Sequence, residues 1–207
     1  MNKLLSGIKK LQKTKVKQKV NKRVREFGSF KRKNTKQWFS ELCFCILTAN
    51  SKAHTALKIQ DDLGVKGFCD CASGDVKKCI VKHKHRFHNN KTKFIVEARK
   101  HIDIKNKLKK LDDYEAREWI VKNIKGIGYK EASHFLRNVG YKRLAIVDRH
   151  ILNLMAENKI IKKPKSLTRG KYLEIEVKFN KLAKKLKMNS AELDLYMWFM
   201  KTGEVLK

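Results

Sequence analysis

The sequence is poor in proline, glycine and acidic residues, and it lacks long apolar runs. Its 207 residues include 1 proline and 10 glycines, so few positions interrupt regular helices. No stretch approaches the roughly 20 apolar residues that span a bilayer. No segment of useful length alternates apolar and polar residues as a half-buried strand does. These absences argue against a membrane-spanning protein and a β fold, and they predict an all-α fold.

The scarcity of acidic residues leaves a large positive charge. The chain has 51 lysines and arginines against 20 aspartates and glutamates, which gives a net charge of +31 at pH 7. Such an excess predicts a polyanionic partner, and nucleic acid is the first candidate. Composition alone leaves open a ribosome-like or membrane-surface protein. Hydrophobic residues make up 42% of the chain, enough to bury a core and too many for a disordered basic tail.

The beginning of the chain lacks the apolar core of a signal peptide, because residues 3–20 alternate lysines with apolar residues. We therefore expect a cytoplasmic protein without membrane contact. The five cysteines are an odd number in such a chain, and we expect them to be reduced thiols.

Apolar residues at helical spacing predict helices along most of the chain. Segment 36–50 is apolar almost all round and is interpreted as a central buried helix. Segment 3–27 is lysine-rich and is interpreted as a basic surface helix. Further helices are expected over residues 52–63 (stopped by Gly64), 92–109, 112–124, 130–139, 149–157, 171–186 and 189–201.

Residues 66–90 raise the question of a metal site, since they contain Cys69, Cys71, Cys79, His83, His85 and His88. Zinc sites usually space paired cysteines as C-x2-C or wider, and Cys69-Asp70-Cys71 is tighter than that. The spacing disfavours zinc. The preferred interpretation of this segment is a set of buried small residues followed by a basic loop.

A turn of sequence Gly126-Ile127-Gly128 lies between two predicted helices. Glycines let a tight turn form and let a phosphate approach its backbone N–H groups. The second helix adds the positive end of its dipole. Lys122 and Lys125 precede the turn, so the hairpin is suited to gripping a nucleic-acid backbone without reading its sequence.

Two charged residues near the hairpin each have two interpretations. Lys130 is either one more phosphate contact or a nucleophile, because the helix dipole and partial burial both favour the neutral amine that attacks carbon. Asp148 is either the N-cap of the next helix or a carboxylate that stabilises a cationic sugar, and these two roles are compatible.

Residues 124–132 (IKGIGYKEA) followed by 147–150 (VDRH) resemble the helix-hairpin-helix–Gly/Pro…Asp superfamily of DNA glycosylases. The run KEASHFLRNVGY and the ending ELDLYMW…VLK resemble, within it, the archaeal type 2 8-oxoguanine DNA glycosylase/AP lyases. Two features depart from the superfamily pattern. Residues 145–147 contain neither glycine nor proline, and no cysteine follows Cys79, so we expect no iron–sulfur cluster.

The resemblance implies two helical lobes with the helix-hairpin-helix motif at a DNA-binding cleft. Residues 40–145 would form one lobe, and residues 1–39 with 146–207 the other. It also implies a monomeric enzyme that excises 8-oxoguanine from double-stranded DNA and then cuts the strand. Alternatives are a glycosylase for other oxidised bases, an AP lyase alone, or a non-catalytic helix-hairpin-helix DNA-binding protein.

The resemblance also assigns roles to the reacting residues. Lys130 would attack C1′ of the damaged nucleotide and form a Schiff base, and β-elimination would follow. Asp148 would stabilise the charge on the sugar. Asn50 would fill the space left by the flipped base. The remaining DNA contacts would come from the hairpin, at Lys125, Gly126, Ile127 and Gly128.

The base pocket and a cation site complete the implied set. Phe87 and Trp198 would sandwich the flipped purine, with Asp194 beside them, and the carboxylate of Lys207 would help to read the base. No cofactor is expected to be required. A sodium or potassium ion is expected at the backbone carbonyls of Lys122, Ile124 and Ile127.

Overall fold

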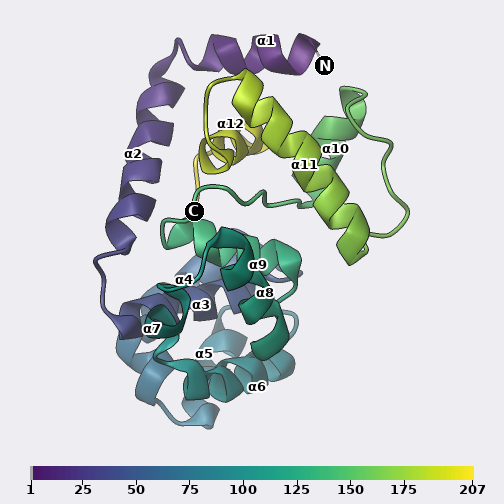
Figure 1. Cartoon of the computed structure of the whole chain (residues 1–207). Helices are drawn as coiled ribbons and strands as arrows, with labels where there is room; N and C mark the ends of the chain where they lie inside the picture. Colours follow the sequence, from purple (N-terminus) through teal and green to yellow (C-terminus); the bar gives the residue numbers. More distant parts are fainter. Residues whose placement is uncertain (1) are drawn as a thin grey trace. The chain divides into compact units, whose positions relative to one another are not determined.

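The computed structural model describes residues 2–207, and every regular element in that range is a helix. These residues form twelve α-helices and one short 3-10 helix, which confirms the predicted all-α fold (Figure 1). Among them, no helix combines the length and the apolar character that crossing a membrane requires.

The chain divides into two compact units. Residues Arg32–Phe135 form one, here called the central unit. The chain up to Lys31 and residues Leu136–Lys207 form the other, here called the terminal unit. Both divisions fall earlier than the positions 39/40 and 145/146 expected from the sequence.

Local packing explains the earlier divisions. The Trp38 ring meets the Phe135 ring edge-on, with 6.1 Å between centroids, so both residues belong to the central unit. Gly140 lies so close to α2 that a Cβ atom there would come within 2.9 Å of the Phe27 carbonyl oxygen. The loop after α9 therefore belongs with α2 in the terminal unit.

The central unit is built around helix α3 (Thr35–Thr48), in which every residue from Trp38 to Thr48 is buried. The side chain of Asn34 accepts from Gln37 N and begins this helix with a capping box. Helix α3 packs against α4, α6 and α7. The other elements of the unit are α4 (Ala53–Asp70), α5 (Ser73–Lys82), α6 (His88–Ala98), η1 (Arg99–His101), α7 (Ile104–Leu108), α8 (Asp113–Asn123) and most of α9 (Tyr129–Asn138).

Three expectations for the central unit need correction. Gly64 has φ 58° and kinks α4, but helix continues beyond it to Asp70. The predicted loop within residues 66–90 contains α5, which buries Val76 and Ile80 one helical turn apart. The single helix expected over residues 92–109 is instead α6, η1 and α7.

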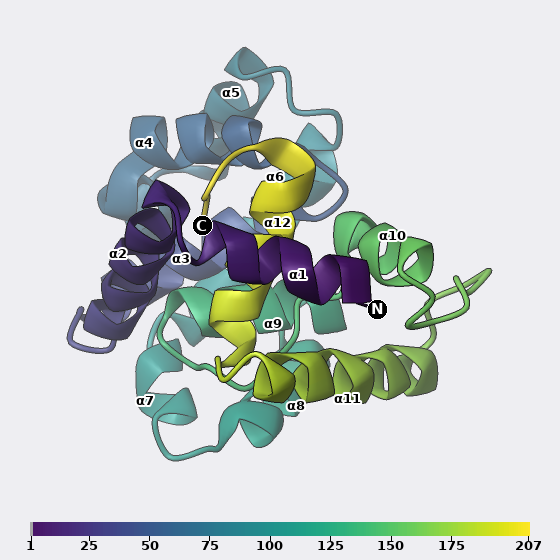
Figure 2. The same cartoon turned by 90° about the horizontal axis from the view of Figure 1, so that it is seen from above.

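The terminal unit is built around helix α12 (Ser190–Thr202), which packs against α1, α2, α10 and α11 (Figure 2). Those helices span Asn2–Leu11, Lys15–Phe30, Arg149–Glu157 and Arg169–Lys185. The single basic helix expected over residues 3–27 is therefore two. The Thr14 hydroxyl accepts from Val16 N at 3.2 Å and starts α2 anew. Leu4, Ile8 and Val20 are buried, so α1 and α2 contribute to the core.

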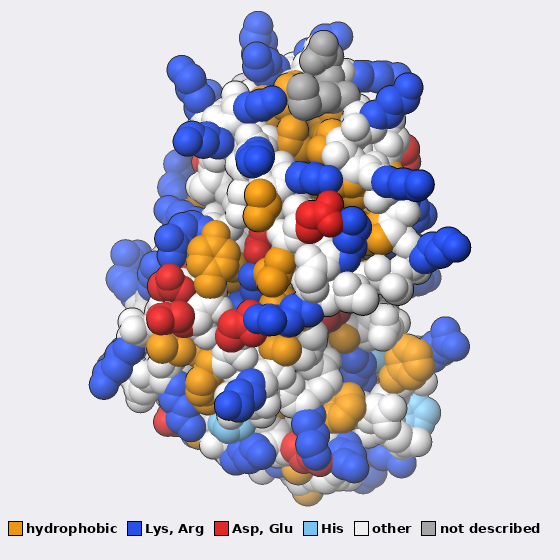
Figure 3. Space-filling view, turned by 45° about the vertical axis from the view of Figure 1, so that its right-hand side comes forward, with side chains coloured by type: hydrophobic (Ala, Val, Ile, Leu, Met, Phe, Trp, Pro, Cys, Tyr) orange, Lys and Arg blue, Asp and Glu red, His pale blue; other side chains and the backbone are white. Residues whose placement is uncertain are grey.

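The surface reflects the charge excess. Lysine and arginine side chains cover much of the face in Figure 3, and acidic side chains form small, scattered groups on it. On this face the basic residues are thus spread out rather than confined to one tail.

Candidate active site

The hairpin turn lies between the end of α8 at Asn123 and the start of α9 at Tyr129. Its two glycines have different roles. Gly126 has φ 81°, and a Cβ atom there would lie 2.3 Å from a carbon of the Phe94 ring. At Gly128 a Cβ atom would meet nothing nearer than a Glu131 carboxylate oxygen at 3.8 Å. Gly126 is therefore required by the fold, whereas the space beside Gly128 is open.

Two polar links hold α8 and α9 together around the turn. The Tyr129 hydroxyl donates to the Glu118 carboxylate at 2.6 Å. Arg117 is 1% exposed, and its guanidinium donates to the Ser133 hydroxyl at 3.3 Å while lying over the Tyr129 ring. Because both links join α8 to α9 on either side of the turn, they rigidify the hairpin. They were not predicted from the sequence.

Lys130 is the second residue of α9. Its side chain is 27% exposed, and its Nζ lies 3.4 Å from Glu131 Oε1. The amine is thus largely enclosed but still accessible from outside. Lys125, in contrast, is 69% exposed and pairs with Glu97 at 3.3 Å, while Ile127 is buried.

Two buried basic side chains bind the carboxyl end of α3. Lys91 Nζ donates to the Ile46 carbonyl oxygen at 2.7 Å. His85 Nε2 lies 2.9 Å from the Leu47 carbonyl oxygen, and its Nδ1 accepts from Phe87 N at 3.2 Å. Burial lowers the pKa of His85, which fits a neutral ring with the proton on Nε2. The last carbonyls of a helix lack partners within it, and these side chains supply them.

Lys91 is also coupled to the residues at the start of α9. Burial lowers its pKa to about 8, the charge of Glu131 opposes that shift, and the charge of Lys130 adds to it. The burial of Lys91 could have been predicted from the sequence. Lys91, Ile95 and Ala98 share one face of α6 at helical spacing, and all three are buried.

Asn50 and Phe87 lie close in sequence to these anchors. Asn50 follows α3, is exposed and has a left-handed φ of 57°. Phe87 precedes α6, is half-buried, and has the Arg86 guanidinium 5.0 Å from its ring centre. Lys91 and His85 therefore fix the helix end that presents Asn50, and His85 also fixes the backbone of Phe87.

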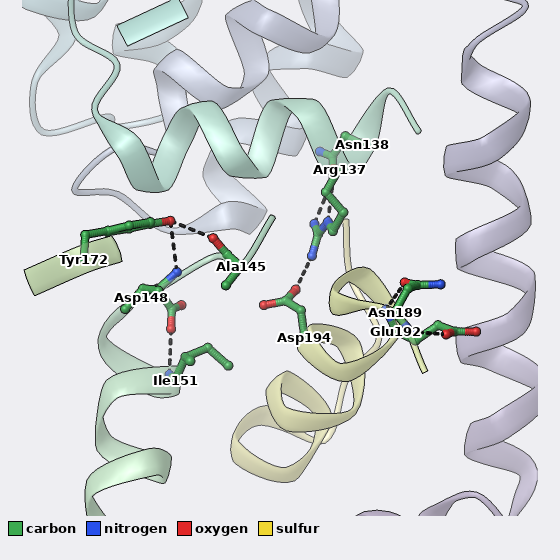
Figure 4. A network of polar contacts seen from close by, with 10 residues as sticks. Arg137, Asn138, Ala145, Asp148, Ile151, Tyr172, Asn189, Glu192 and Asp194 are labelled. Atoms are coloured by element: carbon green, nitrogen blue, oxygen red, sulfur yellow. Dashed lines mark hydrogen bonds and ion pairs between the residues drawn. The ribbon is translucent and has the colours of Figure 1, made fainter. Parts of the chain in front are cut away.

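Asp148 caps α10 in the terminal unit (Figure 4). Its Oδ1 accepts from Ile151 N at 2.8 Å. The segment before it is held by the Tyr172 hydroxyl, which donates to the Ala145 carbonyl oxygen at 2.7 Å and accepts from Val147 N at 3.3 Å. The predicted N-cap role of Asp148 is thus confirmed, and residues 145–147 before it are anchored to α11.

The other predicted pocket residues of this unit lie on or after α12. Asp194 is 4% exposed and forms a buried ion pair with Arg137 (Figure 4). The Trp198 ring meets the His150 ring edge-on at 4.9 Å, and its buried Nε1 has no hydrogen-bond partner among the described residues. Gly203, with φ 77°, ends α12, and Lys207 follows in a half-buried segment.

The predicted residues are therefore shared between the units. The central unit contains Lys130, the hairpin turn with Lys122, Ile124 and Lys125, and also Asn50 and Phe87. The terminal unit contains Asp148, Asp194, Trp198 and Lys207. Sequence reasoning missed the groups that hold them in place, chiefly Lys91, His85, Arg117, Tyr172 and Arg137.

Comparison with known proteins gives consistent matches. A family model described as 8-oxoguanine DNA glycosylase matches residues 20–188. The chain is 45% identical over 206 residues to the 8-oxoguanine DNA glycosylase/AP lyase of Methanocaldococcus jannaschii, with 99% of each chain covered. It is 41% identical over 207 residues to the protein of that name from Korarchaeum cryptofilum, covering 99% of this chain and 98% of the other.

The solved structures agree with the sequence matches. The Methanocaldococcus jannaschii 8-oxoguanine glycosylase/lyase in complex with 15mer DNA containing 8-oxoguanine superposes with a TM-score of 0.96. The identity is 45%, and 99% of each chain is covered. The similarity therefore extends over both units.

Proposed function

The chain belongs to the 8-oxoguanine DNA glycosylase family, and we propose that it excises 8-oxoguanine from double-stranded DNA and then cleaves the strand as an AP lyase. The observation that carries this proposal is Lys130, an enclosed but accessible amine at the start of α9, beside a hairpin locked by Gly126 and Arg117. We further propose that the protein acts as a monomer in the cytoplasm.

The reaction requires the damaged nucleotide to leave the helix, because its C1′ atom cannot be reached inside the base stack. Asn50 would fill the vacated space, since it is exposed and directly follows the anchored end of α3. The hairpin would hold the DNA backbone through the amides of residues 126–128, where the open space beside Gly128 suits a phosphate, and through Lys125.

The chemistry then proceeds through Lys130. Its neutral amine attacks C1′, and the bond from C1′ to the base breaks, with its electron pair leaving on the base. Loss of a proton from the amine and opening of the sugar ring give a Schiff base. Removal of a proton from C2′ then expels the 3′ phosphate by β-elimination. Asp148 would stabilise the positive charge that develops on the sugar, since an N-cap carboxylate is fixed in orientation.

Each unit contributes candidate residues for binding the base. Phe87 and Trp198 supply aromatic faces for stacking. Arg137 fixes the orientation of the Asp194 carboxylate, which supports a role for that residue in positioning rather than in chemistry. Lys207 is proposed as a further contact to the base.

A monovalent cation is proposed at the hairpin. The ion would be sodium or potassium, bound by the carbonyl oxygens of Lys122, Ile124 and Ile127, which accept no backbone hydrogen bond outside the helices among residues 2–207. The ion would stabilise the turn and add positive charge next to a DNA phosphate.

Excision assays on matched duplexes test the proposed substrate. The duplexes would contain 8-oxoguanine, guanine, an oxidised pyrimidine or an abasic site at one position. The proposal predicts base release and strand cleavage at 8-oxoguanine far above guanine. Faster excision of the oxidised pyrimidine, or cleavage of the abasic duplex alone, would support one of the sibling activities instead.

A further inference from the structure

Three side chains with different metal-binding atoms converge on the outside of the central unit. Asp62 lies on α4, Cys79 lies on α5, and His83 directly follows α5. A carboxylate oxygen of Asp62, the sulfur of Cys79 and a ring nitrogen of His83 all lie within 4.8 Å of one another. Neither the reaction proposed above nor the hairpin uses these residues.

The backbone already holds the three groups in a binding arrangement. Cys79 and His83 are four residues apart at the end of one helix, so their side chains share a face. Asp62 reaches them from the neighbouring helix: its Oδ2 is 2.8 Å from His83 Nε2 and 3.9 Å from Cys79 Sγ. One carboxylate oxygen thus contacts both other ligand atoms.

The three ligand types are those that zinc prefers, and the distances between the ligand atoms are close to those of a zinc site. Thiolate, imidazole and carboxylate are its usual ligands, with bonds of about 2.0–2.3 Å, which places ligand atoms about 3.3–3.8 Å apart in a tetrahedron. The observed 2.8 and 3.9 Å lie on either side of that range, and the Cys79 and His83 atoms lie within 4.8 Å of each other, so side-chain rotations would have to close the tetrahedron. Three protein ligands leave a fourth position for water.

We propose that Asp62, Cys79 and His83 bind one zinc ion, which joins α4 to α5. On binding, the Cys79 thiol loses its proton to solvent, and His83 binds as the neutral ring. The expectation against zinc rested on Cys69 and Cys71, whose spacing is too tight, and it left out Asp62. The helix α5, which the sequence reasoning missed, is what places Cys79 and His83 on one face.

Lys82 would compete with the metal ion for the Asp62 carboxylate. Its Nζ lies 2.8 Å from Asp62 Oδ2, so an ammonium now occupies part of the position a cation would take. The Lys82 side chain is 68% exposed and can leave without exposing any core. Removing it should therefore strengthen zinc binding, whereas removing a ligand should weaken it.

Cobalt titration of the full chain tests the proposal. Co²⁺ replaces Zn²⁺ in such sites, and a cobalt–thiolate bond produces a charge-transfer absorption band. We expect one equivalent of Co²⁺ to give this band and Zn²⁺ to abolish it by displacement. The midpoint of thermal unfolding should rise with zinc concentration, because the metal binds the folded state.

Variants assign the ligands. Cys79→Ser should abolish the band, His83→Gln should weaken Co²⁺ binding, and Lys82→Ala should strengthen it. His88→Gln removes a histidine outside the cluster and should change nothing. A wild-type protein without the band, or a band that survives in Cys79→Ser, would overturn the proposal. Because the readout is spectroscopic, it is independent of whether Lys130 catalyses excision.

Discussion

Asp148 has two roles to separate, since one carboxylate is both the cap of α10 and the proposed stabiliser of a cationic sugar. Asparagine caps helices as well as aspartate does, but it carries no charge. Alanine has neither a capping group nor a charge. The two substitutions therefore remove different sets of properties from the same position.

Asp148→Asn should leave the free energy of unfolding nearly unchanged and lower the rate of excision by an order of magnitude or more. Asp148→Ala should lower both, with a stability loss of about 1 kcal/mol. Denaturant unfolding and single-turnover excision measure the two quantities. Equal excision rates in wild type and Asp148→Asn would show that the carboxylate acts only as a helix cap.

The two hairpin glycines form a second matched pair. Gly126→Ala places a methyl group against Phe94 at a left-handed φ, so we expect a stability loss of about 1–3 kcal/mol. Gly128→Ala should be nearly neutral in stability, because the space is open, but should weaken DNA binding where a phosphate approaches. Unfolding and DNA-binding titrations check both. Unchanged DNA binding in Gly128→Ala would mean that the turn is not the phosphate site.

At the residue scale, the sequence supplied candidates for the reacting groups but not the side chains that hold them in place. Lys130 and Asp148 were predicted from a motif with fixed spacing. Arg117 was one basic residue among 51, and its contact with Ser133 exists only once α8 and α9 are packed. Periodicity describes one helix at a time and contains no information about such partners.

The carboxyl end of α3 directly precedes Asn50, the residue proposed to fill the space left by the flipped base. Lys91 and His85 supply donors to its last carbonyls, and both side chains are buried. A buried ammonium is costly unless its partner compensates, which makes Lys91 a pH-sensitive part of the fold.

Lys91 should make stability depend on alkaline pH. Its pKa is about 8 in the folded chain and rises towards the ordinary value of 10.5 on unfolding. Between these values the unfolded state binds more protons, so folded stability increases as pH rises from about 8 to 10.5. The increase relative to Lys91→Met should be on the order of 3 kcal/mol.

Urea unfolding at a series of pH values would measure this difference. Lys93→Met, on the exposed face of the same helix, is the matched control and should follow wild type throughout. Parallel pH profiles for wild type and Lys91→Met would contradict a depressed pKa at Lys91.

Helices with a continuous apolar face were predictable, and those ended by capping or kinking were less so. Helix α3 was predicted as buried because its apolar residues surround it. Helix α5 was missed because Val76 and Ile80 are its only fully buried apolar residues among lysines and small side chains. The break between α1 and α2 depends on the Thr14 cap, which resembles any other threonine in the sequence.

For the whole molecule, the net charge of +31 sets the expected binding behaviour. Each phosphate neutralised by a basic side chain releases counterions, which lowers log K by about 0.9 per unit of log salt concentration. Binding to undamaged duplex DNA should therefore weaken steeply with salt. Affinities measured over a range of KCl concentrations would show this, and a flat response would contradict binding through the basic surface.

The boundaries of the two compact units differ from those of the two lobes expected from the sequence. The chain changes units at Lys31 and within α9, where Phe135 packs on Trp38 and Gly140 packs on α2. Such boundaries depend on contacts between distant segments, so composition and periodicity alone do not locate them.

Borohydride trapping tests the central claim most directly, namely that Lys130 is the nucleophile. Reduction of the Schiff base joins protein to DNA covalently. We predict an adduct with an 8-oxoguanine duplex for wild type and for the surface control Lys93→Gln, and no adduct for Lys130→Gln at unchanged folding. An adduct that persists in Lys130→Gln, or a wild-type protein that binds DNA without forming one, would contradict the proposed mechanism.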